Sequence, residues 1–154
     1  AHLFNEAELN AINAHIPWTR KFRDEQTENK GERIDLVEWT RANKSKLVLK
    51  PNDDYGGHGI YIGWASPKEE WDAAIKVALA DGDYLVQERV QTSKEMFPML
   101  DDAGNWQMIE QLVDLDPLLY NGKVGSAFTR LSSSELANVS SGGGMVPTFI
   151  IREK

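Results

Sequence analysis

The residues best suited to chemistry lie between positions 47 and 63, where the sequence reads LVLKPNDDYGGHGIYIG. Lys50 ends a short apolar run, and Gly56, Gly57 and Gly59 follow within a turn. Glycines let backbone amides approach an anion closely, and an ammonium at the end of a strand adds positive charge beside them. The pattern indicates a phosphate-binding loop. A hairpin whose glycines only satisfy a tight turn explains these residues equally well.

A second group of charged residues lies in the last third of the chain. An arginine such as Arg130 stabilises charge on a transferring phosphoryl group in many enzymes, although a lone arginine usually pairs with a surface carboxylate. Asp114 and Asp116 are one residue apart, so on a strand both side chains point to the same face. They suit Mg²⁺, but a solvated strand face or a local salt bridge is the commoner explanation. The three histidines show no metal-ligand spacing and the chain has no cysteine, so no zinc site is predicted.

Local patterns predict the elements that position Lys50. We expect a buried strand at 47–49, a partner strand at 60–64 and a further strand at 84–90. Between the last two, Ser66 as N-cap, Pro67 at the first position and Glu69 in a capping box predict a helix that ends at Asp81-Gly82. The apolar face predicted for this helix is formed by Trp71, Ile75, Ala78 and Leu79. Together these elements should place Lys50 and residues 87–90 in one cleft.

The flanking regions differ in character. Asn5 and Glu8 predict a capped helix that Pro17 stops, residues 24–33 read as a solvated loop, and residues 36–39 as a short helix or a turn. Residues 106–151 are rich in strand patterns, and Asn121-Gly122 is the best hairpin signal in the chain. The fold class predicted is α+β, in preference to a doubly wound sheet.

The bulk composition excludes several classes of protein. The 154 residues are 41% hydrophobic and 27% charged, which is typical of a soluble globular protein, and no apolar run is long enough to span a bilayer. The net charge of -7 argues against nonspecific binding to nucleic acid or to an anionic membrane. The absence of cysteine is compatible with a reducing compartment, and a cytoplasmic location is expected.

The order of these pieces resembles the circularly permuted ATP-grasp proteins. Their pattern is similar to IPWTR at 16–20, LVLKPNDDYGGHGI at 47–60, VQERV at 86–90, a late arginine and asparagine at Arg130 and Asn138, and GGG-x-VP at 142–147. The resemblance covers nearly the whole chain. It implies an ATP-grasp-like fold with mixed and antiparallel sheets and flanking helices. Residues 1–45 would be an N-terminal helix and polar linker, 46–95 a glycine-loop and hinge subdomain, and 96–154 a strand-rich subdomain that completes the ATP cleft.

The resemblance also implies a role for individual residues. Lys50 would hold the α- and β-phosphates of ATP, and the loop formed by Gly56, Gly57, His58 and Gly59 would fold over the β- and γ-phosphates. The hinge would read the adenine edge through the backbone of Gln87, Glu88 and Val90. Four further roles are implied: Glu95 on the ribose, Arg20 as a second basic contact, Arg130 as the catalytic cation, and Asn138 on phosphate or a metal-bound water.

The sequence departs from the family pattern in two ways. His58 stands where the family loop commonly has lysine, so its charge would depend on pH. No Glu-x-Asn pair, the usual ATP-grasp magnesium set, follows the Gly142 region. In the permuted family that set precedes this segment, so we expect the chain to be a C-terminal piece whose partner is the remainder of its own full-length chain. The residues that bind Mg²⁺ are then unknown.

Two functions follow as hypotheses. In the first, ATP with Mg²⁺ phosphorylates an unknown carboxylate, and an amine attacks the acyl phosphate; the isolated chain would be inactive. In the second, the chain is a noncatalytic nucleotide-binding or protein-interaction module, for which an acidic surface with several tryptophans is suited. A protein kinase is disfavoured because the sequence has neither a His-Arg-Asp loop nor an Asp-Phe-Gly motif.

Overall fold

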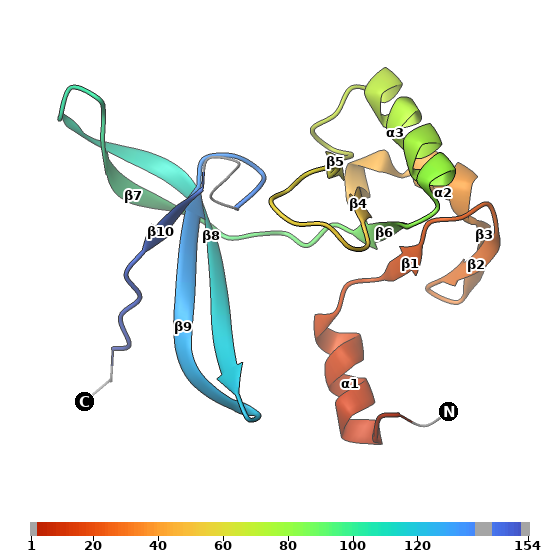
Figure 1. Ribbon diagram of the computed structural model, residues 1–154, viewed down its shortest axis with the longest axis horizontal. Helices are drawn as coiled ribbons and strands as arrows, with labels where there is room; N and C mark the ends of the chain where they lie inside the picture. Colours follow the sequence, from red (N-terminus) through yellow and green to blue (C-terminus); the bar gives the residue numbers. More distant parts are fainter. Residues whose placement is uncertain (1–2, 138–142, 152–154) are drawn as a thin grey trace. The chain divides into compact units, whose positions relative to one another are not determined.

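A computed structural model describes residues 3–137 and 143–151 and divides the chain into two compact units, Ala1–Val90 and Gln91–Lys154 (Figure 1). Helices and antiparallel sheets occur together, so the predicted α+β class is confirmed. The predicted segment 1–45 contributes β1 to the sheet of the first unit, in which β1 pairs with β6.

The first unit contains three α-helices, one 3-10 turn and six strands among the described residues. In chain order they are α1 (Glu6–His15), β1 (Thr19–Lys21), β2 (Gln26–Asn29), β3 (Glu32–Asp35), α2 (Leu36–Ala42), η1 (Lys44–Lys46), β4 (Leu47–Pro51), β5 (Tyr61–Ile62), α3 (Lys68–Asp81) and β6 (Tyr84–Glu88). Four strands form an antiparallel sheet in the order β1-β6-β4-β5, and β2 and β3 form a separate hairpin. The predicted unit of strand, glycine turn, strand, helix and strand is therefore confirmed.

The hydrophobic core lies on one face of the four-stranded sheet. Successive side chains of a strand point to opposite faces, so Leu47 and Leu49 of β4 are buried together with Val86 of β6. Helix α3 covers this face with Trp71, Ala74, Ile75 and Ala78. The opposite face of the same strands carries the half-buried Val48, Lys50, Leu85 and Gln87.

The ends of helices α1 and α3 agree in part with the capping predicted from the sequence. Asn5 and Glu8 form the predicted capping box at the start of α1, and Gly82 ends α3 in the left-handed conformation with φ +77°. The predicted start of α3 is wrong by one residue: Pro67 is the N-cap and no side chain caps the helix. The carbonyl of Ser66 instead accepts a hydrogen bond from Lys44 Nζ at 2.7 Å. Leu79, predicted on the buried face, is 36% exposed.

The prediction of a solvated loop at 24–33 is wrong, because this segment forms most of the β2–β3 hairpin. Its turn is Lys30-Gly31, with φ of +51° and +86°, which is the backbone shape that suits a two-residue hairpin loop. These polar strands are stabilised by hydrogen bonds from residues outside the hairpin. Trp18 Nε1 and Arg20 Nη2 both donate to the carbonyl of Glu28, at 3.0 and 3.1 Å. Residues 36–39, for which the sequence predicts either a short helix or a turn, belong to helix α2.

The second unit is an antiparallel sheet of four strands in the order β10-β9-β8-β7. The strands are β7 (Lys94–Leu100), β8 (Trp106–Tyr120), β9 (Lys123–Ser132) and β10 (Gly144–Val146). The strand-rich region and the hairpin at Asn121-Gly122 are confirmed, with φ of +50° and +74° at the two turn residues. Strand β7 was not predicted. It pairs with β8 along its whole length, and this partner strand is not evident from β7's own sequence.

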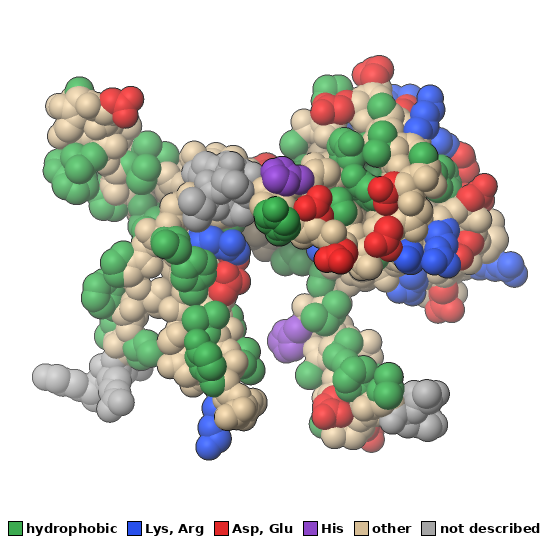
Figure 2. Space-filling model, in the orientation of Figure 1, with side chains coloured by type: hydrophobic (Ala, Val, Ile, Leu, Met, Phe, Trp, Pro, Cys, Tyr) green, Lys and Arg blue, Asp and Glu red, His purple; other side chains and the backbone are tan. Residues whose placement is uncertain are grey.

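Few hydrophobic side chains of the second unit are buried. Among its described residues only Leu112 and Leu131 are buried hydrophobics, whereas Trp106 is 70% exposed and Met145 67%. Figure 2 shows many hydrophobic side chains on the visible face of this unit. In the described part of the chain, no helix combines the length and the apolar character needed to cross a membrane.

Candidate functional site

Lys50 lies at the end of β4, on the sheet face that α3 does not cover. Its Nζ donates a hydrogen bond to Oε1 of Gln87 on the adjacent strand β6, at 2.9 Å. Gln87 Nε2 in turn donates to Oγ1 of Thr19 on β1, at 2.7 Å. Of the residues 87–90 that were predicted to share one cleft with Lys50, Gln87 contacts it, whereas Glu88 and Val90 line a different hollow. Thr19 was missed at the sequence level, because a hydrogen bond across strands leaves no local signal.

The glycine loop between β4 and β5 borders a pocket of about 340 Å³. The pocket is lined by Lys50, Pro51, Asn52, Asp54, Tyr55, Gly57, His58, Ile60 and Leu85. Gly56 and Gly57 have consecutive φ values of +72° and +79°, which are unfavourable for residues with a Cβ. The loop thus brings Gly57 and His58 to the same pocket as the Lys50 side chain.

Gly59 has a packing reason to be glycine. Its φ is +65°, and a Cβ built there would meet Tyr84 Oη at 2.8 Å and Pro51 Cγ at 2.9 Å. The turn interpretation therefore accounts for Gly59 without any ligand. A phosphate-binding role for the loop depends instead on Gly56 and Gly57, whose consecutive positive φ values give a backbone path that favours glycine.

Arg20 and Glu88 lie on the other face of the sheet from Lys50. In the strand register Arg20 is opposite Val86, whereas Lys50 is opposite Leu85, and directly opposed residues share a face. Arg20 donates from Nε to Thr27 Oγ1 and from Nη1 to the carbonyl of Thr19, at 3.1 and 2.9 Å. The predicted basic pair of Lys50 and Arg20 is thus divided between two faces.

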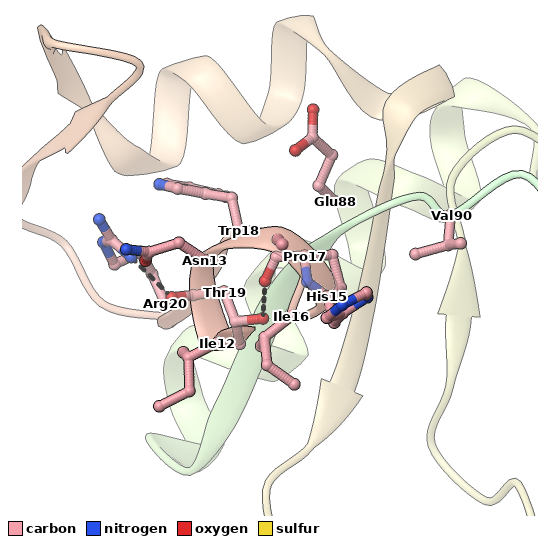
Figure 3. A pocket seen from close by; sticks show the side chains of 11 residues that line it. Ile12, Asn13, His15, Ile16, Pro17, Trp18, Thr19, Arg20, Glu88 and Val90 are labelled. Carbon is pink, nitrogen blue, oxygen red and sulfur yellow. Dashed lines mark hydrogen bonds between the residues drawn. The ribbon is translucent and has the colours of Figure 1, made fainter. Parts of the chain in front are cut away.

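A second hollow, of about 640 Å³, adjoins that other face (Figure 3). It is lined by the end of α1, by β1 and by the end of β6, including Ile12, His15, Ile16, Pro17, Trp18, Arg20, Glu88 and Val90. The Arg20 guanidinium carbon lies 5.0 Å from the centre of the Trp18 ring, a cation–π distance. Glu88 forms an ion pair with Lys30 at 3.1 Å.

The remaining predicted residues belong to the second unit. Arg130 Nε donates to Asp114 Oδ2 at 2.8 Å, and its Nη2 contacts both Asp114 and, at 3.2 Å, Asp116. The register places Arg130 directly opposite Asp114 on β8. The local salt bridge considered for each of these residues is therefore the arrangement found. Glu95 is exposed on β7 opposite Gln111, and Asn138 lies outside the described residues.

Metal ligands are not grouped in the described residues, which hold no cluster of three or more His, Asp or Glu side chains suited to an ion. Asp114 and Asp116 are occupied by Arg130. The geometry therefore offers no cage for Mg²⁺ within ranges 3–137 and 143–151, and no residue is assigned to it.

No protein-family model matches the sequence, and no curated protein matches it.

Proposed function

We propose that the first unit binds ATP through its phosphates at Lys50 and the glycine loop, in the manner of an ATP-grasp protein. The observation that supports this best is the placement of Lys50. Its ammonium lies on the open sheet face, beside the pocket lined by Gly57 and His58. This is the arrangement of charge and glycine backbone that an anion requires.

The charge of Lys50 itself adds support, with Asp54 as the one carboxylate among the residues that line its pocket. In the described part of the chain Lys50 makes no ion pair with a carboxylate; its one side-chain partner is the neutral amide of Gln87. An amide oxygen holds an ammonium without cancelling its charge, so that charge remains for an anionic ligand. Among the described residues, six other lysines and arginines form ion pairs with acids: Lys21, Lys30, Arg41, Lys68, Lys94 and Arg130.

The end of β6 supports a hinge role. The amide of Glu88 donates to the carbonyl of Trp18 at 2.8 Å, and the amide of Arg89 donates to the carbonyl of Lys46 at 2.7 Å. Val90, which follows them, has no hydrogen-bonded amide in the described part of the chain and its side chain is 60% exposed. In this proposal the Val90 amide is the donor that reads the adenine ring, so the nucleotide must extend from the hollow that Val90 lines to the separate pocket beside Lys50.

The proposed reaction belongs to the full-length protein. A carboxylate oxygen of the acceptor attacks the γ-phosphorus, the bond to the β–γ bridging oxygen breaks, and ADP leaves. An amine nitrogen then attacks the acyl carbon, phosphate leaves, and the nitrogen loses its proton to solvent or a base. Mg²⁺ accompanies the ATP phosphates without an assigned protein ligand. The acceptor classes, a carboxylate and an amine, rest on the family resemblance alone.

A noncatalytic nucleotide-binding module is the second candidate. It is favoured by the surroundings of Arg130, whose guanidinium is paired with two aspartates. An arginine held in this way contributes to a sheet without any contact to a phosphoryl group. Binding of ATP with no turnover by the full-length protein would select this candidate.

Calorimetric titration of the chain with ATP and with adenosine, each with and without Mg²⁺, tests the proposal. Lys50→Ala should weaken ATP binding by about 1.5–3 kcal/mol, the range for a hydrogen bond to a charged group, and leave adenosine binding unchanged. Lys76→Ala, which removes an exposed lysine of α3, is the matched control. Equal losses for ATP and adenosine, or no ATP binding by the wild-type chain, would contradict the proposal.

A further inference from the structure

Three adjacent strands are joined by one line of side-chain hydrogen bonds that ends at Lys50. Thr19 Oγ1 on β1 donates to the carbonyl of Pro17 at 2.9 Å and accepts from Gln87 Nε2 on β6 at 2.7 Å. Gln87 Oε1 then accepts from Lys50 Nζ on β4 at 2.9 Å. All of these side chains are partly buried, so solvent competes only in part for each bond.

The direction of each bond is determined by the chemistry of its atoms. A threonine hydroxyl has one proton, and the Pro17 carbonyl can only accept, so the Thr19 oxygen is left as the acceptor for Gln87 Nε2. The Gln87 amide must then present its oxygen to Lys50. A flipped amide would place two donors against each other at Lys50 and two acceptors against each other at Thr19. Thr19 therefore selects the amide orientation that Lys50 needs.

The strand register explains how Gln87 reaches Lys50. Gln87 lies opposite both Thr19 and Val48, and Lys50 is two residues beyond Val48 on the same face. Diagonal neighbours on one face are within reach of long side chains. A lysine has four rotatable bonds, and a ligand that orders a free lysine pays for that ordering in affinity. A lysine already held by Gln87 avoids most of this cost.

We propose that Gln87 and Thr19 are positioning residues that aim the Lys50 ammonium at its anion while leaving its charge uncancelled. The ligand in this inference, the phosphate groups of ATP, rests on the proposed function. The role of the Gln87 side chain is separate from a hinge role of its backbone. A glutamate at position 87 would accept from Lys50 equally well, but its carboxylate would neutralise the charge that the anion is to meet.

Four variants separate positioning from a purely structural link between strands. Thr19→Val removes the hydroxyl at nearly constant volume, and Thr19→Ser retains it. Gln87→Glu replaces the amide by a carboxylate. Thr40→Val is the matched control, because it makes the same exchange at a buried position of α2 away from Lys50.

Two measurements are made on each variant: the NMR signal of the Lys50 side-chain ammonium without ligand, and the ratio of ATP to adenosine affinity. Thr19→Val should displace the Lys50 signal and lower the ratio by about 3- to 10-fold, as for loss of a neutral hydrogen bond. Thr19→Ser should restore both. Gln87→Glu should lower the ratio by about 10-fold or more, as for loss of an interaction with a charged group. Thr40→Val should change neither.

The outcomes for the two proposals are distinct. An unchanged Lys50 signal in Thr19→Val overturns the positioning role, whatever the ATP affinity. A displaced signal with an unchanged affinity ratio also overturns it, because the network would then be structural only. If Lys50→Ala leaves ATP affinity unchanged, the proposed function fails, and the inference that Lys50 is aimed at phosphate fails with it. A displaced signal would in that case still show that Thr19 orients Gln87.

Discussion

Lys50 and Arg130, the two cations that stand out in the sequence, have different surroundings in the structure. Lys50 donates to the neutral amide of Gln87, whereas Arg130 is paired with Asp114 and Asp116. A cation beside an amide retains its full attraction for an anionic ligand. A cation between two carboxylates has most of its charge neutralised, so it attracts an anionic ligand much less. At the scale of single residues, Lys50 is therefore the stronger candidate for contact with phosphate.

Thr40 presents a polar atom that the fold leaves unsatisfied. Its side chain on α2 is fully buried, and Oγ1 has no hydrogen-bond partner within the described residues. A buried hydroxyl without a partner loses its hydration without compensation. Thr40→Val, which removes the hydroxyl at nearly constant volume, should raise the free energy of unfolding by about 1 kcal/mol. Urea denaturation measures this difference. A destabilised variant would show that the hydroxyl has a partner after all.

Gly63, among the described residues, has almost no room for a side chain. A Cβ there would lie 1.9 Å from the carbonyl oxygen of Lys44 and 2.8 Å from that of Leu47, and backbone atoms cannot rotate away. Gly63→Ala should therefore destabilise the first unit by about 3 kcal/mol or more. Gly82→Ala is the control: its site is open, so only the positive φ of +77° opposes it, at a cost of about 1 kcal/mol. In thermal melts, the melting temperature of Gly63→Ala should be lowered more than that of Gly82→Ala. Equal melting temperatures for the two variants would contradict the prediction.

Helices α2 and α3 are joined on the surface by one aspartate. Asp72 on α3 contacts Arg41 of α2 at 3.2 Å and Lys68 of its own helix at 3.1 Å. The hydrogen bond from Lys68 is the largest cause that lowers the pKa of Asp72, and the charges of Lys68 and Arg41 act in the same direction. The ionised form of Asp72 is therefore favoured by folding.

This lowered pKa predicts how stability depends on pH. A carboxyl whose pKa is depressed by folding stabilises the protein above its unfolded value, about 3.9, and this contribution is lost as pH falls through the folded pKa. Asp72→Asn should thus be less stable than the wild type near neutral pH, and the difference should shrink below about pH 4. Urea titrations across this interval measure it. Asp24→Asn, which removes an exposed acid with no ion pair among the described residues, should show no such convergence.

The hydrophobic core of the molecule is distributed unevenly along the chain. Every residue of the main core cluster lies between Phe22 and Val86. The second unit has a long, well-paired sheet but buries only Leu112 and Leu131 among its described hydrophobic side chains. Strand pairing alone does not stabilise a sheet in water, since a sheet needs an apolar face that is covered. The two units should therefore differ in their ability to fold alone.

Separate expression of the two units tests this difference. Residues 1–90 should unfold cooperatively on heating and give well-dispersed amide signals in NMR spectra, because they contain the complete core. Residues 91–154 should show no cooperative transition and should associate through exposed side chains such as Trp106. Circular dichroism melts and gel filtration measure both behaviours. A cooperative, monomeric 91–154 would contradict the prediction.

Much of the fold could be read from local sequence because local physics decides it. The capping box at Asn5, the left-handed stop at Gly82 and the turn at Asn121-Gly122 each depend on a few neighbouring residues. The order of β4, β5, α3 and β6 likewise follows from apolar periodicity and glycines. The predictions were wrong where residues distant in the sequence determine the structure. The polar strand β2 accepts hydrogen bonds from Trp18 and Arg20, and β7 is stabilised by its pairing with β8.

For the candidate site, the sequence by itself determined that a lysine ends a buried strand next to clustered glycines, since both are properties of consecutive residues. Only the tertiary structure decided which residues face that lysine. Strand register placed Gln87 and Thr19 on the face of Lys50 and turned Arg20 and Glu88 to the opposite one. It also placed Arg130 directly opposite Asp114. A shift of one residue in pairing reverses the face of every side chain, and no local pattern in a single sequence specifies that register between strands far apart in the chain.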